Sequence, residues 1–487
     1  MAERGWDRRF EQYAADLIGR SGIPGAAVAL AHKGKVVYER GFGHRDAARK
    51  LPVTPDTRFG LGSVTKSFPA LAIMQLEEAG VLSVDDPVTR WLPEFRLPHP
   101  DDAQYVPAIT IHHFLTHSSG LPPEPALLHA RAGSIAADPD LDRMSPRPMG
   151  VPADIRTWER VQTYEELMAL MGRQRFRLLG PPGQVINYSN EGYVLLAAIV
   201  ERASGRPFAE YLQECVLDPL AMPRTGLYTR ETPPQEPEVI PFAVGVKDGK
   251  REVFGSPAWW DQGQMFGNGG LKSTVQDLLR YLEVYRTGGE GHGKRVLSQA
   301  GVKKMTTPHM PIPLGGAYGY GLRVADVPGL GRTVGHSGGN KGVATQVVAL
   351  PEQGVTAVAL TNLANAPAAL LVSGVVNAYL GQPPEAAWAT YPEHEVSRKQ
   401  LSRFVGVYQG QPGTIARVAV RDGVLYVALA DELQSTRPYS DTGFVIEATG
   451  EPLCFLERPS SGAPDDARAQ VWALFSGLRT MPLAGIS

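Results

Sequence analysis

The sequence contains few cysteines, almost no net charge and no long apolar run. Only two of its 487 residues are cysteines, Cys215 and Cys454, and they lie far apart. This scarcity excludes a disulfide-rich scaffold, and neither residue has a spacing typical of a zinc site. The formal net charge of −2 gives no strong field that would attract nucleic acid or an anionic membrane. We therefore expect neither of these as a partner.

Targeting and membrane-spanning patterns are also absent. The first 20 residues are charged and lack the apolar core of a secretory signal, and no apolar run is long enough to cross a membrane. These features predict a cytoplasmic protein that is not bound to a membrane. Hydrophobic residues make up 43% of the chain and charged residues 20%, as in a globular protein with a sizeable core.

Strand-like and helical patterns follow one another in a way that predicts a large α/β domain. Apolar runs on both sides of Lys33-Gly34 indicate a β-hairpin, and residues 316–362 contain further strand-like runs with short connections. The patterns between these two regions are mostly helical. We predict an antiparallel sheet flanked by helices, with an all-helical part inserted into it. The domain spans residues 1–385, with the α/β part at about 1–80 and 260–385 and the helical part at about 81–259.

Three segments of this domain carry specific expectations. The helix that follows residue 63 contains Pro69, which removes a backbone hydrogen bond and predicts a kink, or a helix that is regular only beyond it. Residues 109–122 are typical of a helix that ends in a turn at Gly120. Residues 123–160 are rich in proline, arginine and alanine and show little periodicity, so we interpret them as a lid over a pocket.

The composition changes near residue 385, which predicts a second, smaller domain. Residues 386–395 have the character of a linker. Beyond them, strand-like runs alternate with turns, and Asp422-Gly423 is typical of a hairpin turn. We predict that residues 396–487 form a small all-β domain, a barrel.

The segment Ser63-Val64-Thr65-Lys66 is the only Ser-x-x-Lys sequence in the chain. If a helix starts here, Ser63 and Lys66 lie on one face, about one turn apart. Taken alone, this pattern is more typical of a helix cap beside a solvated charge. A serine next to a proton acceptor is also the arrangement that activates a nucleophile. No acidic residue occurs between positions 57 and 76 to hold Lys66 in its charged form through local sequence.

A second motif, Tyr188-Ser189-Asn190, is the only Tyr-x-Asn sequence among 17 tyrosines. Lysine and tyrosine have reference pKa values of about 10, so neither is a good base in water. In a shared, partly buried site, a nearby cation lowers the pKa of the phenol and desolvation lowers that of the amine. Either Lys66 or Tyr188 could accept the proton of Ser63, and the pair is coupled. Asn190 would face the same way on extended backbone and could orient Lys66 and the substrate.

A third motif, His336-Ser337-Gly338, lies at the end of a predicted strand. The three motifs in this order resemble those of the serine β-lactamase and penicillin-binding protein superfamily. Stretches such as "ITIHHFLTHSSGLP" and "GNGGLKSTVQDLLRYL" are similar to its class C-like branch of S12 peptidases, D-aminopeptidases and esterases. The resemblance covers about residues 10–380, and the C-terminal part is similar to the lipocalin-like β domain of some S12 relatives.

The resemblance implies a β-lactamase-like fold and a role for each motif. Ser63 would be the nucleophile, with Lys66 and Tyr188 as the catalytic proton carriers. The backbone N–H groups of Ser63 and Gly339 would form the oxyanion hole. Asn190 and the third motif, His336, Ser337 and Gly338, would contact the substrate, and no cofactor or metal is implied.

One departure from the pattern concerns the third motif. Lactamases usually carry Lys-Thr-Gly or Lys-Ser-Gly, and neither tripeptide occurs in this chain. Because His336 would be only partly charged near neutral pH, it would hold a substrate carboxylate less firmly than a lysine. This favours an esterase or peptidase over an efficient β-lactamase.

We therefore expect a serine hydrolase that cleaves ester or amide bonds of a small molecule or short peptide through an acyl-enzyme on Ser63. Two alternatives remain: a penicillin-binding or sensing module that acylates with little turnover and with weak β-lactamase activity, or a protein whose C-terminal domain is the functional part. A homo-oligomer is compatible with either. His112, His113 and His117, two of which are spaced i, i+4, are more typical of a capped helix end than of a metal site, because no third ligand or flanking acid accompanies the spaced pair. Trp259 and Trp260 are compatible with an acyl pocket or with core packing.

Overall fold

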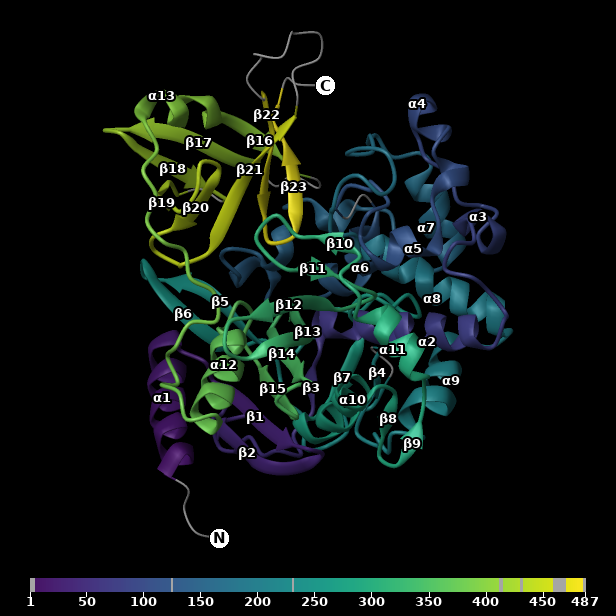
Figure 1. Ribbon diagram of the computed structural model, residues 1–487, viewed down its shortest axis with the longest axis vertical. Coiled ribbons are helices and arrows are strands. Elements are labelled where there is room, and N and C mark those ends of the chain that lie inside the picture. The colour runs from purple at the N-terminus through teal and green to yellow at the C-terminus, as the bar shows by residue number, and fades with distance from the viewer. Residues whose placement is uncertain are drawn as a thin grey trace.

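The computed structural model contains two β-sheet assemblies with a helical part beside them (Figure 1). It describes residues 5–123, 126–229, 232–410, 415–429, 432–458 and 470–484. The larger assembly is an eight-stranded antiparallel sheet with the order β10-β11-β12-β13-β14-β15-β1-β2. This confirms the predicted fold class. The strands are β1 (Gly25–His32), β2 (Lys35–Gly43), β10 (Met310–Pro311), β11 (Ala317–Tyr318), β12 (Arg323–Val327), β13 (Gly331–Asn340), β14 (Val343–Leu350) and β15 (Val355–Thr361).

Helices cover both faces of the central strands. Helices α1 (Gly5–Ser21) and α12 (Ala368–Tyr379) pack on one face, and α10 (Val275–Thr287) packs on the other. Side chains of β1 alternate between the two layers, so that Val28 contacts the α1 and α12 side and Ala27 contacts the opposite side. Because both faces are buried, the sequences of these strands are continuous apolar runs and do not alternate between apolar and polar residues.

Both predicted hairpins are present. Lys33 and Gly34 join β1 to β2 with φ angles of 49° and 78°. Asp422 and Gly423 join β17 (Ile415–Arg421) to β18 (Val424–Ala428) with φ angles of 50° and 81°. Two consecutive positive φ angles are the geometry of a type I′ turn, which glycine adopts without strain and which suits the twist of the paired strands.

The inserted part is mainly helical, and it also contains strands that the sequence did not indicate. These are β4 (Gly226–Leu227) and the hairpin of β5 (Phe242–Lys247) and β6 (Lys250–Gly255). Strand β4 pairs with β7 (Leu271–Ser273), which pairs in turn with β3 (Phe59–Gly60). The remaining elements are α2 (Ser67–Glu78), α3 (Val88–Trp91), α4 (Pro100–Ala103), α5 (Ile111–Leu115), α6 (Leu127–Ala136), α7 (Tyr164–Met171), α8 (Asn190–Ser204), α9 (Phe208–Leu212), β8 (Glu290–Gly291), β9 (Lys294–Arg295) and α11 (Gln299–Met305).

The expected disturbance at Pro69 does not occur where the sequence placed it. A 3-10 helix at Gly62–Lys66 leads directly into α2, and the regular α-helix begins at Ser67, two residues before the proline. Pro69 therefore lies in the first turn of α2. Backbone N–H groups there have no partner within the α-helix, so the missing N–H of proline has little effect.

The helix predicted over residues 109–122 is shorter than expected. Helix α5 ends at Leu115, because His117 takes a left-handed conformation with a φ of 58°. Gly120 also has a positive φ, of 80°, and lies in the loop that follows. Within the segment interpreted as a lid, residues 127–136 form helix α6, and short 3-10 turns follow it.

The C-terminal part is a second antiparallel eight-stranded sheet, with the order β16 to β23. An isolated bridge between Tyr408 and Leu483 links the first strand to the last, which closes the sheet into a barrel. This agrees with the predicted small all-β domain. Its elements are α13 (Arg398–Leu401), β16 (Gly406–Gln409), β17 (Ile415–Arg421), β18 (Val424–Ala428), β19 (Gln434–Pro438), β20 (Gly443–Ile446), β21 (Pro452–Arg458), β22 (Gln470–Ser476) and β23 (Arg479–Pro482).

The barrel packs directly against the larger part of the molecule. Cys454 and Phe475 are buried in the same apolar cluster as the helices around α2 and α8. The turn between β22 and β23 reaches the chain just before α8, where Tyr188 N donates to the carbonyl of Leu478 at 3.0 Å. In the described ranges, no helix has both the length and the apolar character needed to cross a membrane.

Candidate active site

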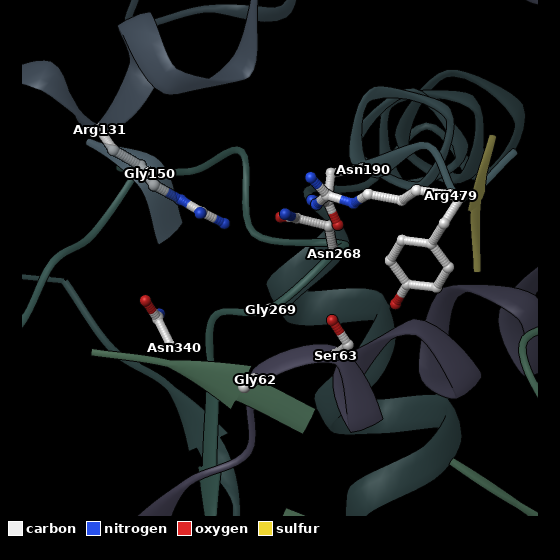
Figure 2. Close-up of a pocket in the computed structure, with 11 residues that line it drawn as sticks. Gly62, Ser63, Arg131, Gly150, Asn190, Asn268, Gly269, Asn340 and Arg479 are labelled. Carbon is white, nitrogen blue, oxygen red and sulfur yellow. The ribbon is translucent and has the colours of Figure 1, made fainter. Parts of the chain in front are cut away.

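Ser63 lies in the 3-10 turn that precedes α2, at the wall of a cavity of about 320 Å³. The same turn carries Lys66, whose Nζ lies 3.2 Å from Ser63 Oγ. Figure 2 shows the Ser63 hydroxyl pointing into the cavity. The i, i+3 spacing therefore places the two side chains together, as helical geometry requires.

Lys66 is fully buried, and oxygen atoms of three other residues lie within hydrogen-bond distance of its side-chain nitrogen. Nζ donates to Asn190 Oδ1 at 2.7 Å and to the carbonyl of Asn268 at 2.8 Å, in addition to Ser63 Oγ. These acceptors come from three separate segments of the chain. Asn190 thus contacts Lys66 directly, as its predicted role requires, whereas no sequence motif singles out Asn268.

Tyr188 completes this group. It lines the same cavity as Ser63, and Lys66 Nζ lies 4.6 Å from the centre of its ring. Ser189 is the N-cap of α8 and accepts from Gly192 N through its hydroxyl, so Asn190 is the first residue of the helix. The Tyr-x-Asn spacing therefore places one side chain before the helix and one on its first turn, both beside Lys66.

His117 holds the segment that carries Tyr188. Its Nδ1 accepts from Ser189 N at 3.1 Å, and its carbonyl accepts from Asn187 N at 2.9 Å. The ring lies 4.2 Å from that of Tyr188, centre to centre. Burial, and to a smaller extent nearby Lys66, keeps the pKa of His117 well below its usual value, so the ring is neutral. The sequence pattern around His117 indicates only a helix end or a metal site, and it does not reveal this contact.

The other histidines of this region have structural partners. His113 and Thr110 form a reciprocal cap at the start of α5, as the sequence predicts for a capped helix end. His112 Nδ1 lies 2.8 Å from Tyr320 Oη. Among the residues that the structure describes, no group of three or more potential ligands could hold a metal ion.

Strand β13 runs beside the turn that carries Ser63. A Cβ atom at Gly62 would lie 2.7 Å from Gly339 N, and one at Gly338 would lie 2.0 Å from the carbonyl of Leu61. These distances are too short for any side chain, so glycine is required for the close approach of the two backbones. Gly339 itself lines the cavity. The approach brings Gly339 to the same wall as Ser63.

The rest of the third motif is not at the cavity wall. His336 is 2% exposed, and its Nε2 lies 2.7 Å from Tyr318 Oη. Burial, followed by the charge of Lys66, lowers the pKa of His336 to about 3, so the ring is neutral near pH 7. Ser337 is exposed, and neither it nor Gly338 is among the residues that line the cavity. The structure thus brings together Ser63, Lys66, Tyr188, Asn190 and Gly339, and His336, Ser337 and Gly338 are not among the residues that line the cavity.

Two tryptophans that were candidates for an acyl pocket lie elsewhere. Trp260 is buried, and its Nε1 donates to Asp138 Oδ2 at 2.8 Å. Lys272 Nζ lies 4.1 Å from the centre of the Trp259 ring. Neither residue lines the cavity at Ser63, which supports the core-packing interpretation.

Residues 6–373 match the family described as Beta-lactamase. The chain belongs to this family. Penicillin-binding protein 4* of Bacillus subtilis is 28% identical over 465 residues, which is 91% of this chain and 92% of that protein. Esterase EstB of Burkholderia gladioli is 31% identical over 338 residues, 65% of this chain and 79% of the esterase. The octameric penicillin-binding protein homologue from Pyrococcus abyssi superposes with a TM-score of 0.65 at 29% identity, and the match covers 96% of this chain and 95% of that one.

The match to the Pyrococcus abyssi structure extends over the C-terminal barrel as well as the family domain. The family resemblance inferred from the three motifs is therefore confirmed. The relatives are named as penicillin-binding proteins and as an esterase, which makes a serine hydrolase the class of enzyme that agrees with all of them.

Proposed function

We propose that the protein is a serine hydrolase that cleaves ester or amide bonds through an acyl-enzyme on Ser63. The observation that carries this proposal is the 3.2 Å contact between Ser63 Oγ and the buried Nζ of Lys66, at the wall of a cavity that Tyr188 also lines. A hydroxyl becomes an effective nucleophile when a group within hydrogen-bond reach takes its proton. The names of the relatives support the same class of reaction.

In the proposed reaction, Ser63 Oγ forms a bond to the carbonyl carbon of the substrate while its proton passes to the Lys66 and Tyr188 pair. The same pair then returns a proton to the leaving alcohol or amine as the bond to it breaks. Water attacks the resulting ester of Ser63 by the reverse sequence, which releases the acid and restores the hydroxyl. We assign the proton to the pair rather than to one residue, since two coupled groups share their titration.

The oxyanion that forms in both steps would accept hydrogen bonds from the backbone N–H groups of Ser63 and Gly339. Support comes from the close approach of strand β13 to the turn at Gly62. In other enzymes, the loss of one such donor costs about 3 kcal/mol of transition-state stabilisation. Asn190 would keep Lys66 Nζ directed at Ser63 through its 2.7 Å contact.

The second candidate is a penicillin-binding protein that acylates with little turnover, favoured by the long match to penicillin-binding protein 4*. The neutral state of His336 argues against firm binding of the carboxylate of a β-lactam at the third motif. The two candidates differ in the rate at which water releases the acyl group.

One experiment separates these candidates. The purified protein is treated with a fluorescent fluorophosphonate and, separately, assayed with p-nitrophenyl esters, D- and L-aminoacyl p-nitroanilides and nitrocefin. A hydrolase gives labelling at Ser63 together with sustained turnover of an ester or an anilide. An acylating module gives the label and a single burst of product. Loss of both in Ser63→Ala, with both retained in the surface control Ser402→Ala, supports Ser63; retention in Ser63→Ala contradicts the proposal.

A further inference from the structure

Tyr188 lies in an irregular stretch of chain, so no helix or strand fixes its position. Residues 185–189 belong to no regular element, and α8 begins only after them. Buried backbone groups outside helices and strands need other partners. On one side these partners come from His117, whose carbonyl accepts from Asn187 N and whose Nδ1 accepts from Ser189 N. The other partners lie on the C-terminal barrel.

The turn between β22 and β23 of the barrel makes three hydrogen bonds to this stretch. Tyr188 N donates to the carbonyl of Leu478 at 3.0 Å. Thr480 N donates to Asn187 Oδ1 at 2.9 Å, and Thr480 Oγ1 donates to the carbonyl of Ile186 at 2.8 Å. Thr480 and Asn187 are 0% and 1% exposed, so water cannot replace these bonds. The barrel therefore holds the backbone of Tyr188 from the side opposite His117.

The same turn keeps a leucine where its backbone favours glycine. Gly477 and Leu478 have φ angles of 55° and 66°, the geometry of a type I′ turn. A bulky side chain is rarely found at such an angle. The Leu478 side chain packs against the apolar cluster that contains the helices around α2 and α8. Leu478 is thus seated on the larger part of the molecule, and the next residue, Arg479, lines the cavity.

These contacts come from outside the part of the chain that matches the family. The match ends at residue 373, and the turn lies in the barrel beyond it. Tyr188 itself lies inside the matched part, whereas part of the support of its backbone does not. A displacement of about 1 Å at a reacting group can cost about 100-fold in rate, so contacts that fix Tyr188 bear directly on the chemistry at Ser63.

We propose that the β22–β23 turn of the barrel positions Tyr188 against Lys66. Leu478 and Thr480 are the positioning residues. The inference rests on the proposed function, because Tyr188 carries a proton only in that reaction. The barrel is then a required part of the active site rather than a domain joined to a complete enzyme. Loosening the turn lowers the rate of the chemical steps and leaves substrate binding nearly unchanged.

Two variants of Thr480 in the full chain test the inference. Thr480→Val keeps the shape of the side chain but removes the hydroxyl that donates to the carbonyl of Ile186, whereas Thr480→Ser keeps a hydroxyl. With p-nitrophenyl valerate as substrate, we expect Thr480→Val to lower kcat about 10- to 100-fold at nearly unchanged KM. Thr480→Ser should retain most of the wild-type kcat.

Thr436 provides the matched control. It is 4% exposed, and its Oγ1 donates to the carbonyl of Leu425 at 2.8 Å, a bond within the barrel between β19 and β18. Thr436→Val therefore removes the same kind of buried hydrogen bond without removing a contact to the stretch of Tyr188. Its kcat should equal that of the wild type.

Leu478→Gly separates the positioning of Tyr188 from the formation of the turn. Glycine adopts a φ of 66° without strain, so a turn that served the barrel alone would tolerate this change. The variant removes the side chain that packs on the larger part of the molecule. We therefore expect a lower kcat at nearly unchanged KM.

Amide hydrogen exchange tests the same contact without any turnover. In Thr480→Val, peptides that cover residues 185–189 should exchange faster than in the wild type, and in Thr436→Val they should not. Wild-type kcat in both Thr480→Val and Leu478→Gly, or an equal loss of kcat in Thr436→Val, would overturn the inference and leave the proposed function in place. A lower kcat without faster exchange of this stretch would overturn it as well. Hydrolysis that persists in Ser63→Ala would overturn the proposed function instead.

Discussion

Lys341 and Asp138 form an ion pair that is closed off from solvent, with 1% and 0% of their side chains exposed. Asp138 lies two residues after the end of α6, in the segment interpreted as a lid, and Lys341 follows the last residue of β13. Lys341 Nζ also donates to the carbonyl of Ala258 at 2.7 Å, and Trp260 Nε1 donates to Asp138 Oδ2 at 2.8 Å. The pair thus attaches this segment to the sheet next to the cavity.

Replacement of Asp138 by asparagine should lower the free energy of unfolding by about 3–5 kcal/mol, the cost of leaving a buried charge without its partner. The loss is this large because Lys341 is buried, and removing the charge of Asp138 does not return Lys341 to water. The double variant Asp138→Asn/Lys341→Met should recover most of this loss, because methionine fills a similar volume and carries no charge.

The measurement is a double-mutant cycle. It compares urea unfolding at pH 7 of the wild type, Asp138→Asn, Lys341→Met and the double variant. An exposed pair provides the control: Arg332 Nε lies 3.1 Å from Asp326 Oδ1, with 41% and 71% of the side chains exposed. Asp326→Asn should leave the urea midpoint close to that of the wild type, since surface pairs contribute little to stability. A loss below about 1 kcal/mol for Asp138→Asn, or single losses that simply add in the double variant, would refute the argument that this pair anchors the segment.

Three further predictions concern the site. His117→Phe keeps a ring beside Tyr188 but leaves the buried N–H of Ser189 without its acceptor. We expect the free energy of unfolding in urea to fall by about 1–3 kcal/mol, and kcat to fall at nearly unchanged KM. An unaltered kcat would contradict the role of His117 in positioning Tyr188. Gly338→Ala should destabilise the protein by at least about 1–3 kcal/mol, because its Cβ would meet a backbone carbonyl at 2.0 Å, whereas Gly339→Ala, with open space at that point, should match the wild type in thermal unfolding. Because burial lowers the pKa of His336 to about 3, the unfolded chain takes up a proton on this residue below pH 6.5 that the folded protein does not, so the free energy of unfolding falls by about 1.4 kcal/mol per pH unit below pH 6.5. His336→Gln should make the slope of the free energy of unfolding against pH shallower by that amount between pH 6 and pH 4. An equal slope would show that His336 is not buried in its neutral form.

Local patterns were sufficient for the elements whose residues determine their own conformation. Lys33-Gly34 and Asp422-Gly423 supply the positive φ angles that a tight hairpin needs, so both turns could be predicted. The i, i+3 spacing of Ser63 and Lys66 placed both side chains on one face of a helical turn, which is also a matter of local geometry. The helix over residues 109–122 was overestimated, because nothing in the local sequence shows that His117 adopts a left-handed conformation.

Contacts between distant segments account for what the sequence did not reveal. Arg479 reaches the cavity only because Leu478 and Thr480 dock against the chain before α8, nearly 300 residues earlier. No local pattern at Arg479 encodes that contact. His336 was expected at the substrate from its place in the third motif, and the motif does not encode the burial of its ring beside Tyr318. Environment, rather than residue type, decides whether such a histidine is charged.

The central claim is that Ser63 carries the acyl group, and mass spectrometry of the intact protein after rapid acid quench tests it most directly. The protein is mixed with an excess of p-nitrophenyl valerate, and acid stops the reaction after milliseconds to seconds. A digest of the same sample is used for peptide mapping. We predict a mass increase of one valeryl group, located on Ser63, that appears before steady-state turnover and is absent from Ser63→Ala. An acyl group found on another residue, or steady turnover by Ser63→Ala, would contradict the account.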